Sequence, residues 1–313
     1  MHPMKISCCF ALLAMCVAAP PAESAQKRQG PKKVAKAETA KPIVDMQAVQ
    51  TQVMLDRAGF SPGQIDGAIG ASTNRALDAF TKNGGKADAL PADALVTYCI
   101  TDQDAAGPFT ASIPEDMVEK SKLPALGYTS LLEALAERFH ASPALLRRLN
   151  PGAKFAAGEE IQVPNVADAA PSENNSASTI VTVRKSTSDL VVADATGKVL
   201  MYAPVTTGSE HDPLPIGEWK VTGVQRDPKF HYNPDLFWDA DAAHSKATIP
   251  PGPNSPVGVV WVDITKPHYG LHGTPEPGTI GRSESHGCVR LTNWDATRLA
   301  SLVRPGTKVV FSE

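Results

Sequence analysis

The sequence predicts a multidomain α+β protein: a small helical domain, a module of two helices and a strand, and a C-terminal mainly-β, sandwich-like domain. Apolar residues recur at helical spacing in the first half of the chain. Short β-branched and aromatic runs with turn signals dominate the second half, and polar or Pro-rich stretches separate the segments. The 313 residues leave room for two or three domains.

The overall charge excludes one large class of partner. The chain is 42% hydrophobic and 20% charged, with a formal net charge of −3, as in ordinary globular proteins. Binding to nucleic acid needs a strongly basic face, so we expect no nucleic-acid partner. Basic residues gather only between Lys27 and Lys41, in a Pro- and Ala-rich stretch that we interpret as a linker over residues 25–42.

The N-terminus has the pattern of a secretory signal peptide. Lys5 precedes an apolar run from Ile6 to Ala19 that is too short to span a bilayer, and small residues follow. We therefore predict a signal peptide over residues 1–24, and an exported mature protein without a transmembrane segment. A lipid anchor on Cys16 is the alternative, although Met15 is large where a lipid-attachment motif has a small residue.

The cysteines leave two readings open. Three of the five lie in the predicted signal peptide, which leaves Cys99 and Cys288. In an exported protein these two can form a disulfide, or one can be a working thiol and the other an inert buried residue. The residues around Cys288 favour the second reading, so we expect Cys99 to be buried and not bonded to Cys288.

The first segment, residues 43–100, is predicted to be a small helical domain. Helical spacing of Met46, Val49 and Val53 ends at Ala58-Gly59, and Ser72 or Thr73 can cap a second helix. The run Gly59-Phe60-Ser61-Pro62-Gly63-Gln64-Ile65-Asp66-Gly67, continued by Asn74-Arg75-Ala76-Leu77, resembles the small helical peptidoglycan-binding domain family. That resemblance implies glycan binding; a helical spacer without a ligand is the alternative.

A linker over residues 101–121 leads to a second module, residues 122–165. Ser130 with Glu133 forms a capping box, Ser142-Pro143 begins another helix, and Ile161–Pro164 alternates like a strand. This order, with Leu149-Asn150-Pro151, resembles the LysM glycan-binding module, a βααβ unit. Its first strand is reduced here to Ala125-Leu126-Gly127-Tyr128, so a copy that only packs and binds no glycan is an equal alternative.

A further linker, residues 166–178, precedes the β-rich segment, residues 179–313. Six runs read as strands, and Thr292 with Asp295 forms a capping box before a helix that ends at Leu302. The six runs are Ile180–Val183, Leu190–Ala193, Val199–Tyr202, Trp219–Val224, Val257–Val262 and Val309–Phe311. A sandwich or barrel with little helix follows from this count.

Residues capable of acyl transfer gather in two short stretches, Tyr269–Thr274 and Ser285–Arg290. A cysteine attacks a carbonyl as thiolate, so it needs a base such as an imidazole to take its proton. His272 and His286 both lie near Cys288 in sequence, and spacing does not decide between them. Backbone N–H groups at Gly287 and Cys288 can face an oxyanion, and Arg290 can pair with a substrate carboxylate.

A metal site is the main alternative for the same residues, because His268, His272, His286 and Cys288 are all ligand types that zinc accepts. On one extended strand, His268 and His272 would lie about 13 Å apart, too far to share an ion. We therefore expect no metal, although Pro267 and Gly270 can break the strand geometry. No other cofactor is expected, because a thiol and an imidazole suffice for acyl transfer.

His272-Gly273-Thr274 followed by Ser285-His286-Gly287-Cys288-Val289-Arg290 resembles the YkuD-type L,D-transpeptidase motif. Further matches lie along about the last 135 residues: Asp189-Leu190-Val191-Val192, Val205-Thr206-Thr207-Gly208, Pro215-Ile216-Gly217-Glu218-Trp219, Tyr232-Asn233-Pro234 and Pro256-Val257-Gly258. The resemblance implies that Cys288 is the nucleophile, that His272 is the base, and that the Gly273 carbonyl orients His272. It places Ser285, His286 and Gly287 around the thiol, with Arg290 at a polar or basic position.

The resemblance also implies a function. Cys288 would attack the third residue of a peptidoglycan tetrapeptide stem, D-alanine would leave, and an amine of a second stem would accept the acyl group. A carboxypeptidase that gives the acyl group to water, and a non-catalytic cell-wall-binding protein, are the alternatives. The implied partners are stem peptides and glycan, with an envelope protein as another acceptor. The implied location is the periplasm or cell wall.

Overall fold

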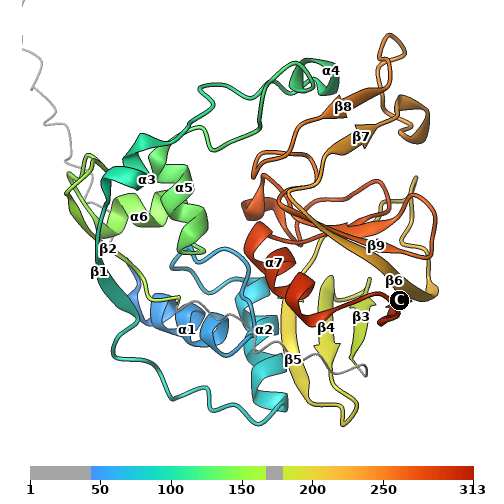
Figure 1. Cartoon of the computed structure of the whole chain (residues 1–313). Coiled ribbons are helices and arrows are strands. Elements are labelled where there is room, and N and C mark those ends of the chain that lie inside the picture. Colours follow the sequence, from blue (N-terminus) through green and yellow to red (C-terminus); the bar gives the residue numbers. More distant parts are fainter. Residues whose placement is uncertain (1–43, 167–178) are drawn as a thin grey trace, which may run out of the picture. The chain divides into compact units, whose positions relative to one another are not determined.

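The computed structural model describes residues 44–166 and 179–313 (Figure 1). The predicted signal peptide and basic linker, and residues 167–178 of the third linker, lie outside the described residues. In the two described ranges, no helix is both long and apolar enough to cross a membrane.

Helices α1 (Met46–Arg57) and α2 (Ala71–Lys82) form the first helical segment, where two were predicted. Asp45 caps α1, because its carboxylate accepts the N–H groups of Gln47 and Ala48. The predicted cap of α2 at Ser72 or Thr73 is wrong. The helix begins after Gly70 without a side-chain cap, and Thr73 lies buried inside it, where it accepts a hydrogen bond from Gln52.

Two strands and two helices form the next part. Strands β1 (Leu95–Cys99) and β2 (Glu160–Pro164) pair antiparallel, and between them lie helices α5 (Leu131–Arg138) and α6 (Pro143–Leu149). The predicted caps Ser130 and Ser142 are confirmed. The predicted first strand at 125–128 is wrong, because β1 occupies that place. Leu126 is instead fully buried against the C-terminal domain, where its N–H donates to the Pro251 carbonyl.

These two predicted modules share one hydrophobic core. Val49 and Val53 of α1 pack in the same cluster as Leu135, Leu145 and Ile161. The predicted linker 101–121 contains two short helices, α3 (Asp102–Ala106) and α4 (Met117–Lys120). The prediction that Cys99 is buried is wrong: it ends β1 opposite Glu160 with its side chain exposed, and both Cys99 and Cys288 are free thiols.

The C-terminal domain is built on one eight-stranded sheet with the order β11-β10-β9-β6-β12-β3-β4-β5. The mainly-β prediction is confirmed, and a single curled sheet replaces the predicted sandwich. The long strand β6 joins the two halves and has a register shift between Val221 and Gly223. The strands are β3 (Ile180–Arg184), β4 (Asp189–Ala193), β5 (Val199–Pro204), β6 (Gly217–Arg226), β9 (Val260–Ile264), β10 (Gly270–His272), β11 (Val289–Arg290) and β12 (Lys308–Ser312).

Helix α7 (Asn293–Leu302) packs on this sheet, and Thr292 caps it as predicted. A separate hairpin of β7 (Phe230–Tyr232) and β8 (Ala247–Ile249) contacts α4. Two short 3-10 turns, η1 (Pro234–Leu236) and η2 (Pro277–Thr279), complete the described elements.

The N-terminal helices contact the sheet directly. Helix α2 lies beside β5, and α5 contacts α7 (Figure 1). At the edge strand β5, the N–H of Tyr202 donates to the Gly59 carbonyl, and the Tyr202 carbonyl accepts the N–H of Ser61. The Ser61 hydroxyl also donates to Asp295 of α7 at 2.8 Å. The described residues, 44–166 and 179–313, thereby belong to one compact unit.

Candidate active site

Two short parallel strands bring the predicted site residues together. Strand β10 pairs with β11 so that Leu271 lies opposite Val289 and His272 opposite Arg290. Cys288 directly precedes β11, and the Leu291 N–H donates to the His272 carbonyl. This pairing places the cysteine and the histidine at one end of the sheet, although 16 positions separate them in the sequence.

The turn before Cys288 is held by its own hydrogen bonds. The Ser285 N–H donates to the Thr207 carbonyl at 3.1 Å, and its hydroxyl donates to the Cys288 carbonyl at 2.6 Å. Gly287 has a φ of 93° and touches the ring of Tyr269, since a Cβ built there would lie 2.5 Å from that ring. Only glycine fits both this conformation and this contact.

The thiol of Cys288 is protonated at neutral pH. Its Sγ donates to the His268 carbonyl over 3.8 Å. Burial raises the pKa of Cys288, and the Gly270 N–H and the Arg290 guanidinium oppose that rise. A group that can take the proton during attack is therefore required for reactivity.

His272 is buried and neutral, with one ring nitrogen committed. Its Nδ1 lies 2.7 Å from the Gly273 carbonyl, which can only accept, so Nδ1 carries the proton and Nε2 has a free lone pair. Burial, together with the charge of Arg290, lowers the pKa of His272 to about 4. Trp261 stacks on the ring, with centroids 5.3 Å apart. At pH 7 the imidazole is thus a base with a fixed orientation.

His286 and Arg290, the other two polar residues of the motif, have different surroundings from His272. His286 pairs through Nε2 with Asp239 at 2.8 Å and packs edge-on against Phe237, so its ring is engaged with the loop after β7. Arg290 is half-buried on β11 beside His272, and its backbone N–H donates to the Thr206 carbonyl. Its guanidinium lowers the pKa of both His272 and Cys288.

The pKa of Cys288 gives a direct prediction. We expect its alkylation by iodoacetamide to become faster up to and beyond pH 9, because the raised pKa keeps the thiol protonated at lower pH. Peptide mapping by mass spectrometry separates its adduct from that of Cys99. A rate that levels off below pH 7 would instead indicate a thiolate already paired with imidazolium, and would contradict the protonated ground state.

Sequence reasoning missed several residues of the site. Trp261, Asp239 and Asn293 contact the predicted residues or the backbone beside them. Trp261 lies opposite His272 across the β9–β10 pair, a register that the sequence offers no local signal for. Asn293 directly follows the predicted cap Thr292, so the sequence indicated only that Asn293 begins a helix.

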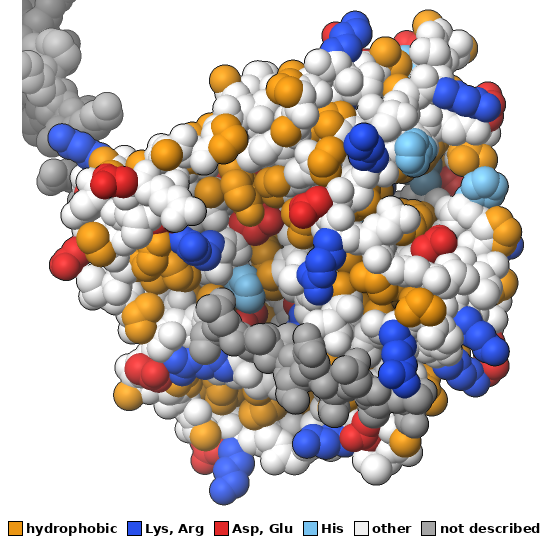
Figure 2. Space-filling model, viewed as in Figure 1, with side chains coloured by type: hydrophobic (Ala, Val, Ile, Leu, Met, Phe, Trp, Pro, Cys, Tyr) orange, Lys and Arg blue, Asp and Glu red, His pale blue; other side chains and the backbone are white. Residues whose placement is uncertain are grey.

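No group of three or more His, Cys, Asp or Glu side chains is arranged to hold a metal ion in the part of the chain that the structure describes. Across the face shown in Figure 2, acidic and basic side chains are interspersed among apolar ones.

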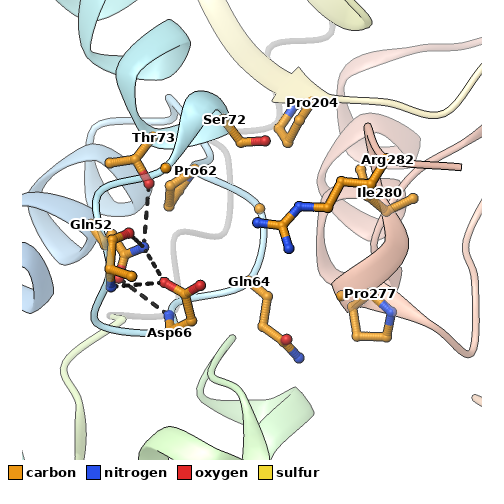
Figure 3. Close-up of a pocket in the computed structure, with 14 residues that line it drawn as sticks. Gln52, Pro62, Gln64, Asp66, Ser72, Thr73, Pro204, Pro277, Ile280 and Arg282 are labelled. Atoms are coloured by element: carbon orange, nitrogen blue, oxygen red, sulfur yellow. Dashed lines mark hydrogen bonds between the residues drawn. The ribbon is translucent and has the colours of Figure 1, made fainter.

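Two cavities lie away from Cys288. A small pocket of about 60 Å³ lies between the first helical segment and the sheet domain, with Arg282 pointing into it opposite Asp66 and Gln64 (Figure 3). Its volume is far below the several hundred Å³ typical of ligand sites. A larger cavity of about 560 Å³ lies at the ends of α5 and α6. Its lining includes Ser130, Leu131, Leu132, Arg147, Asn150, Gly152, Ala153, Lys154 and Phe155.

Comparison with known proteins gives matches to the C-terminal domain. Residues 178–311 match the YkuD family, described as the L,D-transpeptidase catalytic domain. YkuD of Bacillus subtilis (strain 168), which is named for that activity, is 29% identical over 183 residues, 58% of this chain and 93% of the relative. ErfK/SrfK of Escherichia coli (strain K12), also named for it, is 33% identical over 141 residues, 41% of this chain and 44% of the relative.

A solved structure has lower similarity. L,D-transpeptidase 3 from Mycobacterium tuberculosis, in complex with a faropenem-derived adduct, is 18% identical, with a TM-score of 0.36. The match covers 44% of this chain and 60% of that one, so this chain spans less than two thirds of its length. The family match over the sheet domain is the specific result: residues 178–311 of this chain belong to the YkuD family of L,D-transpeptidase catalytic domains.

Proposed function

We propose that this chain is an exported L,D-transpeptidase that cross-links peptidoglycan by cysteine acyl transfer. Cys288 is the nucleophile and His272 the general base and acid. The substrate is a tetrapeptide stem, whose third residue donates its acyl group to Cys288. The match of residues 178–311 to the YkuD family supports the reaction class. No organic cofactor or metal enters the proposed steps, because the thiol and imidazole supply the chemistry.

One observation carries the proposal: His272 is held with Nδ1 bonded to the Gly273 carbonyl, on the strand that pairs with the one that follows Cys288. The free lone pair on Nε2 is the group that a protonated thiol needs. Since the pKa of His272 is about 4, this base is neutral and ready at physiological pH.

The proposed reaction has two acyl-transfer steps. As Cys288 Sγ bonds to the carbonyl carbon of the third residue, its proton passes to His272 Nε2. Backbone N–H groups of Gly287 and Cys288 face the oxyanion, and Ser285 fixes the turn that presents them. The C–N bond to D-alanine then breaks, and His272 returns the proton to the departing amine. An amine of a second stem attacks the thioester, gives its proton to His272, and releases the thiol.

Charged groups near the thiol suit a stem peptide. Arg290 is close enough to affect the pKa of both Cys288 and His272. We assign it the role of binding the substrate carboxylate. His286 is assigned to the wall of the thiol's pocket, where Asp239 holds its ring.

The cavity at the ends of α5 and α6 is the proposed contact with glycan. Its volume of about 560 Å³ is in the range of ligand sites, and Arg147 and Lys154 supply hydrogen-bond donors for sugar hydroxyls. Binding there would tether the enzyme and raise the effective concentration of stems. Periplasm or cell wall is the proposed location, since the substrate is found there.

The test gives purified mature protein a defined disaccharide-tetrapeptide and analyses the products by mass spectrometry. A dimer with the mass of two monomers less one D-alanine supports the transpeptidase. Monomeric tripeptide with free D-alanine would replace it with the carboxypeptidase. If the stem is unchanged, the assay is repeated with an envelope protein bearing a terminal lysine as the amine acceptor. A stem left unchanged there too would remove stem peptides as the substrate class.

A further inference from the structure

A side chain from outside the catalytic domain is linked to the backbone beside His272 through one residue, Asn293. Glu137 lies on α5, and its Oε1 accepts a hydrogen bond at 2.9 Å from Nδ2 of Asn293, the first residue of α7. Asn293 is 1% exposed. A buried amide that is bonded in this way has a fixed orientation.

The other end of the Asn293 amide packs against the two glycines beside the site. Its Oδ1 accepts the Val259 N–H at 3.2 Å, and Nδ2 also donates to the Pro253 carbonyl at 3.1 Å. A Cβ built on Gly273 would lie 2.1 Å from this Oδ1, and one on Gly258 would lie 2.0 Å from it. The amide oxygen thus occupies the space that side chains at these positions would take, and it fixes the Gly273 backbone.

The Gly273 carbonyl is in turn the acceptor that selects the tautomer of His272. We propose that Glu137 is a positioning residue for His272, acting through the Asn293 amide and the Gly273 carbonyl. The role in turnover depends on the proposed function, whereas the effect on the imidazole does not. The N-terminal part would then do more than bind the wall, because it would complete the support of the base.

Glu137 is itself well held. The Tyr128 hydroxyl donates to the same Oε1 at 3.2 Å, and burial raises the pKa of Glu137 to about 7. A glutamine at this position keeps an acceptor oxygen for both donors at nearly the same volume. An alanine removes the acceptor and leaves the Asn293 amide held by the Pro253 carbonyl and the Val259 N–H alone.

The experiment measures the tautomer of His272 directly. The full chain is labelled with ¹⁵N-histidine, and the His272 signals are assigned by their loss in His272→Gln. We expect one Nδ1–H tautomer in the wild type and a second, Nε2–H population in Glu137→Ala. In the stem-peptide assay, we expect Glu137→Ala to lower kcat roughly 10- to 100-fold, with KM changed less than about twofold. Glu137→Gln should restore both readouts.

Glu133→Ala is the matched control. Glu133 lies one turn earlier on α5 and accepts a hydrogen bond at 2.8 Å from Asn254, so its loss weakens the same contact between the two parts without touching Asn293. It should keep the wild-type tautomer and kcat. If Glu137→Ala does not fold, Tyr128→Phe loosens Glu137 more gently and should shift the tautomer in the same direction.

An unchanged Nδ1–H tautomer in the folded variants would overturn the proposal, whatever happens to their melting temperature. An equal shift in Glu133→Ala would also overturn it, because the effect would then come from general loosening of the contact. A wild type that leaves stem peptides intact would refute the proposed function alone, since the NMR comparison still decides the role of Glu137.

Discussion

Replacing Cys288 with alanine should lower D-alanine release from a tetrapeptide stem by roughly 10⁴-fold or more, because loss of a nucleophile removes the covalent route. The structure gives no reason for the fold to change, since Cys288 forms a free thiol at the end of a turn that Ser285 holds. Mass spectrometry of the products checks the rate, and the thermal unfolding midpoint checks the fold.

Cys99→Ser is the matched control for that experiment. Cys99 is an exposed free thiol on β1, so its replacement should leave the rate unchanged. Substantial turnover by Cys288→Ala would remove the entire acyl-enzyme mechanism. An inactive Cys99→Ser variant would show that the exposed thiol has a role that the present mechanism lacks.

Replacing His272 with glutamine should reduce turnover by about 10²- to 10⁴-fold, the usual contribution of a general base. Glutamine fills much of the space beside Trp261 but accepts no proton at neutral pH. The wild-type rate of acylation should be flat between pH 5 and 8 and fall as His272 is protonated near pH 4. A wild-type profile with a midpoint near pH 6.5 would contradict the lowered pKa.

The same pKa predicts an effect on stability. The folded protein binds the His272 proton more weakly than the unfolded chain, whose histidine has a pKa near 6.5. The unfolded state therefore gains protons first as the pH falls, and folding stability is lost between about pH 6.5 and 4. The shift from 6.5 to about 4 corresponds to about 3 kcal/mol. In urea unfolding, the free energy of unfolding of the wild type should fall more between pH 6.5 and 4 than that of His272→Gln.

Local chemistry explains what the sequence could predict of the fold. The caps Ser130, Ser142 and Thr292 each bond to an N–H three residues later, so the pattern is visible in the sequence. Strand β1 was missed because its five residues show no clean alternation of buried and exposed side chains, and its partner follows four helices later. The shared core of the two N-terminal modules was invisible for the same reason: such contacts are not local.

The candidate site divides in a similar way. Cys288 and His272 could be proposed because a motif resembles a known family, whereas spacing alone left His286 equally eligible as the base. The structure shows His286 bonded to Asp239, which comes from a distant loop. Trp261 and Asn293 reach the site only through strand pairing and helix packing, and strands β10 and β11 have three and two residues. Segments that short have no readable period.

The pairing of Tyr202 with Gly59 and Ser61 also decides how this protein can be divided. Strand β5 is the last strand of the sheet, and the first helical segment covers it with backbone hydrogen bonds and the ring of Phe60. An uncovered edge strand is a template for pairing with another chain. A fragment cut at the family boundary would expose that edge and the apolar face of Tyr202, and would tend to self-associate. A fragment meant to keep this edge covered therefore includes the first helical segment with the sheet.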